Sequence, residues 1–415
     1  MIEQTERGEK LTERVLFFDE SSMEQLQAYE LELLEQCWSI FCGNFGSADR
    51  QFIVVGTAYS IPDDYDPSAG RILVFEINRE RRPILVAERK VKGAVFSLDQ
   101  LGEKLVAGIG NKVQLFKWVQ REDGTKSIEL QKECGHNGHI YALYVKARGD
   151  YILVGDLLRS VTLLQYKSID ETLEEVSRDF NTNRMRAIDI IDDDHFLGME
   201  DKGNMFIVRR PRDAATEEER IRLEVRTEVH IGDFVNTIRK GSLNSQPLEQ
   251  DNSVGVSDGI MEDHKEENPS RNLRSNCHLF GTINGMIGSV IVISEESYKF
   301  LSSLERAMKN VVVSVGSFSY DEWRSFHNDR RCGKCNTTID GDFIEQFLEL
   351  SETEMEEVVL RLNDDFCGRA TETDPSSALS VFKAAESTVT SLPPVITTFT
   401  VEDVVRRVED IARAH

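Results

Sequence analysis

A pair of cysteines, Cys332 and Cys335 in the string CGKC, has the spacing of half a zinc site or of a redox pair. A zinc site of this kind needs a second pair of ligands at a matching separation, and the sequence contains no such pair. The nearby residues that could supplement the cysteines are His327 and Cys367. We therefore expect an exposed loop at this position, with metal binding as the alternative.

Two further clusters hold side chains that can bind cations. Asp192, Asp193 and Asp194 lie between two apolar runs, where a turn between strands is expected. Aspartates in such turns usually accept hydrogen bonds from backbone amides. His136 and His139, in the string GHNGHIYAL, are expected to be loop residues and not metal ligands.

None of the short motifs that mark common active sites occurs in this sequence. A nucleophile elbow, a zinc-protease helix and a phosphate-binding glycine loop are all absent. We therefore predict that the protein is not an enzyme and has no catalytic residues, metal or cofactor. A chain of this kind is expected to bind other proteins.

The strongest pattern in the chain is a repeat of paired apolar runs. Each first run leads into a glycine, and a second apolar run follows it. The glycines recur about every 40–50 residues once residues 241–276 are left out, which is the period of a β-propeller blade. We predict a mainly β fold, a β-propeller followed by a small α-helical C-terminal domain. The glycines are Gly56, Gly108, Gly155, Gly198 and Gly281.

The stretch Tyr151–Lys167 shows the repeat most clearly and predicts a hairpin of two strands. Gly155 is expected to permit a backbone conformation that other residues resist. Arg159 is placed at the tip of the hairpin, where a cation can stay hydrated or meet a partner. A plain connecting turn with a solvated arginine is the alternative.

The chain is expected to divide into a propeller at residues 1–294 and a helical domain at residues 295–415. Helix start signals stand at Ser294, Ser351 and Thr400, each followed by an amphipathic segment, and another helix is expected at Asp342–Leu350. Residues 241–276 have the polar composition of a disordered loop, with a regulatory tail as the alternative. Residues 364–398 are typical of a flexible linker.

The N-terminal region is ambiguous by local propensity. Residues 23–36 are rich in helix formers, whereas the preceding string VLFFDES is typical of a strand and a turn. Propensity alone favours a helix. A strand–turn–strand arrangement is the alternative, because tertiary packing commonly overrides propensity.

Composition limits the partners and the compartment. The formal net charge of −24 repels a phosphate backbone, so a protein partner fits better than autonomous binding of nucleic acid. Mean hydropathy is −0.36, and the sequence lacks an apolar run of about eighteen residues or an N-terminal secretory signal. Seven scattered cysteines favour a reducing compartment. We expect a cytoplasmic or nuclear protein without a membrane partner.

Several long, irregular strings resemble one family. The sequence is similar to the C-terminal third of the damaged-DNA-binding adaptors of cullin-4 ubiquitin ligases, a family that includes large polyadenylation-specificity and splicing-factor-3b subunits. The resemblance covers nearly the whole chain from about Val15, apart from residues 241–276 and 364–398. The strings that carry it are KGAVFSL from Lys92, GDYILVGDLLRSVTLL from Gly149, RDFNTNRM from Arg178, DDDHFLG from Asp192, FGTINGMIG from Phe280, WRSFH from Trp323 and IDGDFIEQFL from Ile339.

The resemblance implies the third propeller of that family and its helical C-terminal domain, with strands in place of the ambiguous N-terminal helix. In the family, the first and third propellers grip helical segments of WD-repeat substrate receptors, and the second propeller binds the cullin. The resemblance places the receptor contacts of this chain at Ala58, Ala94, Ser97, Leu143, Tyr144, Leu157, Arg159, Arg178, Phe234, Asn236 and Ile283.

Three departures from the family pattern affect these expectations. The first two propellers and the opening of the third are missing, which leaves about six blades where seven are expected. Cullin-4 would therefore be bound only indirectly. Arg184 stands where the family has a tryptophan, so an aromatic receptor contact is absent.

The resemblance implies a non-enzymatic scaffold in DNA repair and protein ubiquitination, with DNA reached through a complex. It also implies the nucleus, with a fraction in the cytoplasm. Two alternatives stay open. One is a nucleic-acid-binding subunit acting in RNA processing or on damaged DNA. The other is a non-functional truncated paralogue.

Overall fold

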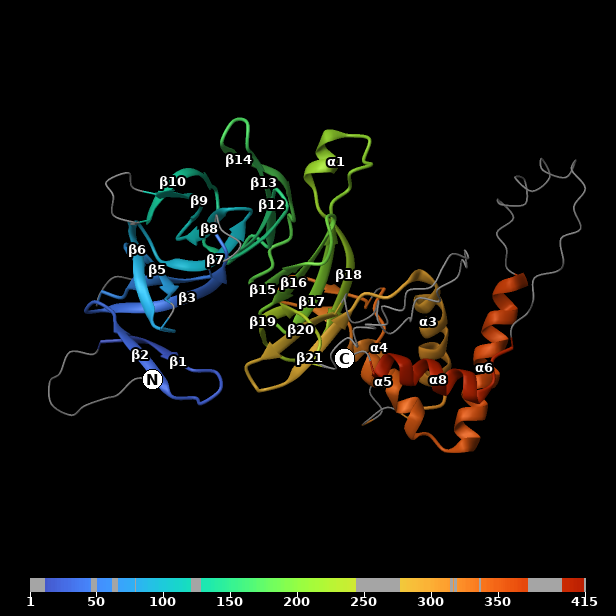
Figure 1. The fold of residues 1–415 in the computed structure, drawn as a ribbon. Coiled ribbons are helices and arrows are strands. Elements are labelled where there is room, and N and C mark those ends of the chain that lie inside the picture. The colour runs from blue at the N-terminus through green and yellow to red at the C-terminus, as the bar shows by residue number, and fades with distance from the viewer. Residues whose placement is uncertain are drawn as a thin grey trace, which may run out of the picture. The chain divides into compact units, whose positions relative to one another are not determined.

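The computed structural model describes residues 12–45, 51–61, 66–78, 80–120, 128–243, 277–313, 316, 319–335, 337–371 and 398–413. The chain divides into two compact units. Figure 1 shows the strands and helices that they contain. Unit 1 comprises Met1–Ile238, Thr282–Gly285 and Phe326–Arg331, and unit 2 comprises Arg239–Gly281, Met286–Ser325 and Cys332–His415. The domain boundary after Ser294 stays a prediction.

The described part of unit 1 holds four antiparallel four-stranded sheets, in each of which strands consecutive in the chain pair with one another. Sheet 1 consists of β3 (Glu35–Gly43), β4 (Phe52–Tyr59), β5 (Gly70–Ile77) and β6 (Pro83–Val91). Sheet 2 consists of β7 (Val95–Leu101), β8 (Lys104–Ile109), β9 (Lys112–Gln120) and β10 (Ile128–Asn137). Sheet 3 consists of β11 (Ala142–Arg148), β12 (Tyr151–Asp156), β13 (Val161–Lys167) and β14 (Thr172–Arg178). Sheet 4 consists of β15 (Met185–Ile190), β16 (His195–Glu200), β17 (Asn204–Arg209) and β18 (Glu224–His230).

The sheets succeed one another as the blades of a β-propeller. The first strand of each sheet packs beside the first strand of the next, β3 on β7, β7 on β11 and β11 on β15. Apolar cores fill the space between consecutive sheets, such as the cluster of Val54, Ile72, Leu105 and Phe116 between sheets 1 and 2. Each apolar run that leads into a glycine is the second strand of its sheet, and strands buried on both faces explain its continuous hydrophobicity.

In three of the second strands, the next sheet approaches the glycine closely. A methyl group on Gly108 in β8 would lie 2.4 Å from the carbonyl oxygen of Ala142 in β11, and one on Gly56 would lie 2.5 Å from Val95. Gly155 in β12 faces Ile188 of sheet 4 in the same way. The prediction that Gly155 supplies an unusual backbone conformation is therefore wrong, and the positive φ of this hairpin belongs to Ser160.

The N-terminal helix favoured by local propensity is wrong. β1 (Arg14–Phe18) and β2 (Gln25–Glu30) pair as an antiparallel hairpin, and β3 pairs along its length with β4. Val15 and Leu31 pack with Val55, Leu73 and Phe75 of sheet 1. This burial of apolar side chains against a distant part of the chain outweighs the helix propensity of the segment.

A three-stranded sheet repeats the same meander with β19 (Val235–Lys240), β20 (Cys277–Thr282) and β21 (Ile287–Ile291). A short helix, α1 (Glu217–Ile221), interrupts the connection between β17 and β18. β22 (Phe326–His327) packs on β17 and β18 of sheet 4. The fold is therefore mainly β with five successive blade-like sheets among the described residues.

Helices predominate in the described part of unit 2 after β21. Their bounds are α3 (Glu295–Lys309), α4 (Tyr320–Trp323), α5 (Gly341–Glu345), the 3₁₀ helix η2 (Gln346–Glu349), α6 (Glu352–Thr371) and α8 (Val401–Ala412), with the short strand β23 (Cys332–Gly333) between α4 and α5. Ser294 caps α3, and Thr400 forms a capping box with Asp403 at the start of α8. Leu304, Phe347, Val358 and Val408 lie in their shared apolar core. None of the described helices is long and apolar enough to span a membrane.

The predicted linker at residues 364–398 and the predicted insertion at residues 241–276 lie mostly outside the described residues. The linker expected from residue 364 is wrong at its start, because α6 continues to Thr371. The rest of that linker, residues 372–397, lies outside the described residues. The same holds for residues 244–276 of the predicted insertion.

Candidate functional site

One edge of the sheets gathers the turns between the second and third strands, among them the turn at Arg159 that the sequence singled out. In an antiparallel meander the first strand begins where the second ends, the third begins and the fourth ends. We call this edge of unit 1 the entry rim. At each blade-like sheet, a backbone N–H in or beside the turn between the second and third strands donates to a carbonyl at the start of the first strand. The pairs are Ser60 to Leu34 (2.8 Å), Gly110 to Ala94 (3.0 Å), Leu157 to Tyr141 (3.3 Å), Asp201 to Arg184 (3.1 Å) and Ile283 to Phe234 (3.1 Å).

Hydrogen bonds also join the entry rim from one sheet to the next. The N–H of Ala142 in sheet 3 donates to the carbonyl of Gly110 in sheet 2 at 2.9 Å. The N–H of Ser160 in sheet 3 donates to the carbonyl of Asn183, just before sheet 4, at 3.1 Å. Backbone hydrogen bonds therefore join the entry rim across sheets 2, 3 and 4.

A β-bulge recurs in the first strand of all four sheets. The register against the second strand shifts by one residue, which leaves Trp38, Phe96, Leu143 and Arg186 as the extra residues. Such bulges redirect side chains. Trp38 contacts Phe96 at 5.2 Å between ring centroids, and Phe96 contacts Tyr141 at 5.6 Å. Of the four bulge residues the sequence prediction included only Leu143, because a one-residue shift in register leaves no mark on composition.

The turn that carries Arg159 is held by buried acids. Asp156, which is fully buried, accepts hydrogen bonds from the N–H groups of Leu158 (2.9 Å) and Arg159 (3.2 Å), and its other oxygen accepts from Ile140 (2.7 Å). The hydroxyl of Ser160 donates to Asp179 at 2.6 Å. The exposed Arg159 donates to the carbonyl of Gly138 at 2.6 Å. The predicted hairpin is confirmed. Hydrogen bonds to Asp156 hold the backbone of its tip, where Arg159 is exposed.

Arg178 ends β14 on the same edge of sheet 3. Its guanidinium donates to Glu175 at 2.7 Å, and Nε2 of His136 lies 3.9 Å from the same carboxylate. His139 lies 3.7 Å from Asp156, but burial lowers the pKa of His139 to about 3, so the ring is neutral at pH 7 and forms no ion pair.

The predicted contact residues lie at or near the entry rim, but they differ in exposure. Ala58 and Ala94 are buried, so their small side chains pack inside the rim. Ser97 is half-buried and accepts a hydrogen bond from the N–H of Val145 at 3.1 Å. Leu143, Tyr144, Leu157, Arg178 and Phe234 are half-buried, whereas Arg159, Asn236 and Ile283 are exposed. That these residues bind a partner stays a prediction.

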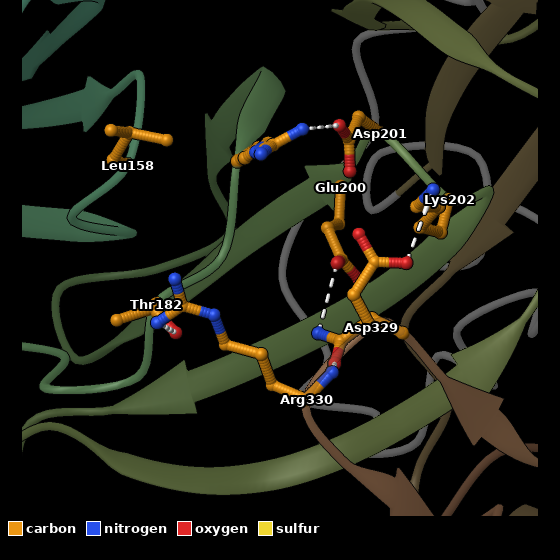
Figure 2. Close-up of a pocket in the computed structure, with 9 residues that line it drawn as sticks. Leu158, Thr182, Glu200, Asp201, Lys202, Asp329 and Arg330 are labelled. Atoms are coloured by element: carbon orange, nitrogen blue, oxygen red, sulfur yellow. Dashed lines mark hydrogen bonds and ion pairs between the residues drawn. The ribbon is translucent and has the colours of Figure 1, made fainter.

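A small polar pocket opens on the entry rim between sheets 3 and 4 (Figure 2). Lys202 pairs with Asp329 at 3.3 Å, and Arg330 donates to the hydroxyl of Thr182 at 2.9 Å. Asn328 donates to the buried Glu200 at 2.9 Å. Sequence reasoning missed this site, since its lining comes from segments far apart in the chain: Leu158, Thr182, Arg184, Glu200–Lys202 and Asn328–Arg330.

The residues first considered for metal chemistry have other roles. Asp192 accepts hydrogen bonds from the N–H groups of Asp194 and His195, both at 2.8 Å, which confirms the predicted turn. Burial raises the pKa of the Cys335 thiol, which lies 2.8 Å from the hydroxyl of Thr338. His136 lies in β10 and not in a loop. Within the described parts of the chain, no three His, Cys, Asp or Glu side chains gather as a metal site would require.

The fold and the entry rim define a β-propeller protein with exposed cations and aromatic residues at one edge of its sheets. The chain belongs to the family described as the CPSF A subunit region, which matches residues 12–349. It is 43% identical over 355 residues to DNA damage-binding protein 1 of Oryza sativa subsp. japonica, covering 86% of this chain and 30% of the relative. It is 41% identical over 361 residues to DNA damage-binding protein 1a of Arabidopsis thaliana, covering 86% of this chain and 31% of the relative.

A third relative is DNA damage-binding protein 1 of Solanum lycopersicum, which is 42% identical over 344 residues, 83% of this chain and 30% of the relative. The chain thus spans about 30% of the length of these relatives. The family resemblance noted in the sequence is confirmed.

Proposed function

We propose that the chain is a non-enzymatic scaffold of a DNA-damage-related adaptor, and that its entry rim holds helical segments of WD-repeat substrate receptors. The observation that carries this proposal is the turn at Arg159, where the buried Asp156 fixes the backbone of an exposed cation on the entry rim. Its relatives are named DNA damage-binding proteins, which supports a role in the response to DNA damage.

The side chains of the entry rim suit the capture of an amphipathic helix. A helix docked in a groove presents an apolar stripe flanked by polar residues. Trp38, Phe96 and Leu143 offer apolar surface at the bulges, and Arg159 with Arg178 offers donors for carbonyls or carboxylates. The apolar surface matches the apolar stripe of such a helix, and the two arginines match its polar border.

The proposal also includes the blade count and the C-terminal helical domain. We assign the β1–β2 hairpin to a further blade, giving about six blades of a seven-bladed type, and the helices after Ser294 to the family's C-terminal helical domain. Cullin-4 would be reached only through another part of the assembly. The site of action would be the nucleus, with a fraction in the cytoplasm, and DNA would be reached through a complex.

The test is co-precipitation of the full chain with a purified WD-repeat substrate receptor. Arg159→Glu combined with Arg178→Gln should reduce recovery of the receptor at least fivefold, since two hydrogen-bonding cations are lost. Glutamine is chosen at position 178 because a glutamate there would repel Glu175.

The matched control changes two arginines at the opposite edge of the sheets. Arg148→Glu with Arg212→Gln makes the same two changes at exposed arginines, with 45% and 48% of their side chains exposed. The control should retain full binding. Equal recovery of the receptor by all three proteins would reject the proposed site.

A further inference from the structure

The pocket beside Arg184 on the entry rim is lined by several cationic side chains. Three cationic side chains line it, those of Arg184, Lys202 and Arg330. They come from the entry of sheet 4, from the turn between β16 and β17, and from the segment that follows β22. Cations from three separate segments of an acidic chain, with its net charge of −24, therefore converge on one small opening.

The carboxylates of the pocket are largely occupied by the protein itself. Glu200 is buried and accepts hydrogen bonds from Asn204 at 2.8 Å and Asn328 at 2.9 Å. Asp201 has 12% of its side chain exposed. Asp329 is exposed and pairs with Lys202 at 3.3 Å, which leaves Arg184 and Arg330 as the cations that do not share that carboxylate.

Arg184 retains donors for a further partner. Its pairing with Asp201 is long, at 3.5 Å, and 53% of its side chain is exposed. A guanidinium carries five N–H donors in a planar fork that matches a carboxylate. Arg330 is also exposed, and its hydrogen bond to Thr182 at 2.9 Å uses one of its nitrogens, Nη1.

Apolar surface lies directly beside these cations. Leu158 lines the pocket and is 38% exposed, and Phe180, two residues before Thr182, is 58% exposed. Arg159 extends the cationic surface on the neighbouring turn. A helix that placed an apolar side chain on Leu158 would bring its neighbouring polar positions to Arg184 and Arg330.

We infer that this pocket receives a glutamate or aspartate side chain of the captured helix, so that the entry rim selects helices with an acidic residue beside their apolar stripe. This inference rests on the proposed function and specifies its partner. The resemblance places a tryptophan at the position of Arg184, so the acidic preference would distinguish this chain from a protein with an aromatic contact there.

The test uses the full chain and three synthetic amphipathic helical peptides with the same leucine stripe. They differ at one position beside the stripe, which is Glu, Gln or Lys. Affinity is measured by fluorescence anisotropy at low and high salt. The Glu peptide should bind about two- to fivefold tighter than the Gln peptide, and the Lys peptide should bind weakest, as expected for a partly exposed ion pair. High salt should reduce the difference.

Two variants of Arg184 test whether this residue causes the preference for the Glu peptide. Arg184→Trp should keep peptide binding but lose the difference between Glu and Gln, and Arg184→Glu should favour the Lys peptide. Arg212→Glu, a change at a similarly exposed arginine at the opposite edge of sheet 4, should leave the order unchanged. Thermal unfolding of each variant checks that it is folded.

The outcomes separate this inference from the proposed function. Tight binding of all three peptides with equal affinity would overturn the acidic preference while leaving helix capture standing. The same holds if the preference persists in Arg184→Trp. Binding of none of the peptides would overturn both.

Discussion

The carboxylate of Asp156 accepts a hydrogen bond from the backbone N–H of Arg159 at 3.2 Å, so a fully buried acid fixes the turn that presents an exposed cation. Asp156→Ala should lower the free energy of unfolding by about 2–3 kcal/mol, because it leaves the N–H groups of Ile140 and Leu158 without this acceptor. It should also weaken receptor binding, and urea unfolding together with co-precipitation measures both effects.

The control for this variant is Asp192→Ala. Asp192 organises a turn at the opposite edge of the sheets through similar bonds to Asp194 and His195, but its side chain is 52% exposed. This change should cost less stability and leave receptor binding intact. Loss of binding in both variants would show that the turn at Arg159 has no special role.

Close packing between sheets predicts a large cost for Gly108→Ala. The added methyl group would lie 2.4 Å from the carbonyl oxygen of Ala142, and backbone atoms cannot move aside without shifting a strand. We expect the free energy of unfolding to fall by about 1–3 kcal/mol in urea titrations. Gly341→Ala, where the methyl group would meet no atom within 4 Å, should be neutral or slightly stabilising. Similar losses in both variants would contradict the packing account.

The buried ion pair of Glu35 and Arg71 in sheet 1 predicts that the stability of the fold falls at acid pH. Burial raises the pKa of Glu35, but hydrogen bonds from Arg71 and Thr57 outweigh burial, and the pKa lies below its ordinary value of 4.5. A depressed pKa means that the carboxylate stabilises the fold above the unfolded-state value, and that this stability is lost as the pH falls through the folded-state value.

Glu35→Gln tests this linkage. At neutral pH the variant should be less stable by about 1.5–3 kcal/mol, since Arg71 loses one charged hydrogen-bond partner but keeps Glu32 at 3.0 Å and Glu88 at 3.1 Å. The difference from the natural protein should narrow below about pH 4.5. Glu30→Gln, at an exposed pair with Arg14, should have little effect at any pH. A difference for Glu35→Gln that is equal at pH 7 and pH 3 would contradict the prediction.

The helical core of unit 2 gives a prediction within that unit alone. Leu304 of α3 is fully buried among apolar side chains, and Leu304→Ala should lower the stability of the helices by about 2–5 kcal/mol. Leu360→Ala in α6 changes the same residue type at a site that is 64% exposed, and its effect should be small. Far-ultraviolet circular dichroism in urea follows the helices, and equal midpoints for both variants would contradict this core.

Sequence reasoning identified the strands where the chain signals them locally. The hairpin at Tyr151–Lys167 is recognisable because both strands are apolar runs separated by a polar turn. β1 was recognisable in the string VLFFDES, but β2 and β3 were not recognisable by propensity, because residues 23–36 are rich in helix formers. This segment forms strands because β3 pairs with β4 and Leu31 packs on Val55. Those contacts are non-local, and composition does not report them.

The candidate site was only partly predicted, because some of its features also depend on non-local contacts. The resemblance identified the rim positions, but it could not tell that Ala58 and Ala94 are buried while Arg159 is exposed. The pocket around Arg184 and Arg330 was missed, because residues 146 apart meet there only through the tertiary fold. Bulge residues such as Trp38 and Phe96 were missed because strand register is set by pairing.

The central claim is that the entry rim binds another protein, and hydrogen exchange of the full chain with and without a purified WD-repeat substrate receptor tests it most directly. We predict slower amide exchange on binding at residues 156–160 and 178–186, and unchanged exchange at the opposite turns, residues 148–151 and 192–195. Protection confined to the opposite turns, or no protection with a receptor shown to bind, would contradict the claim.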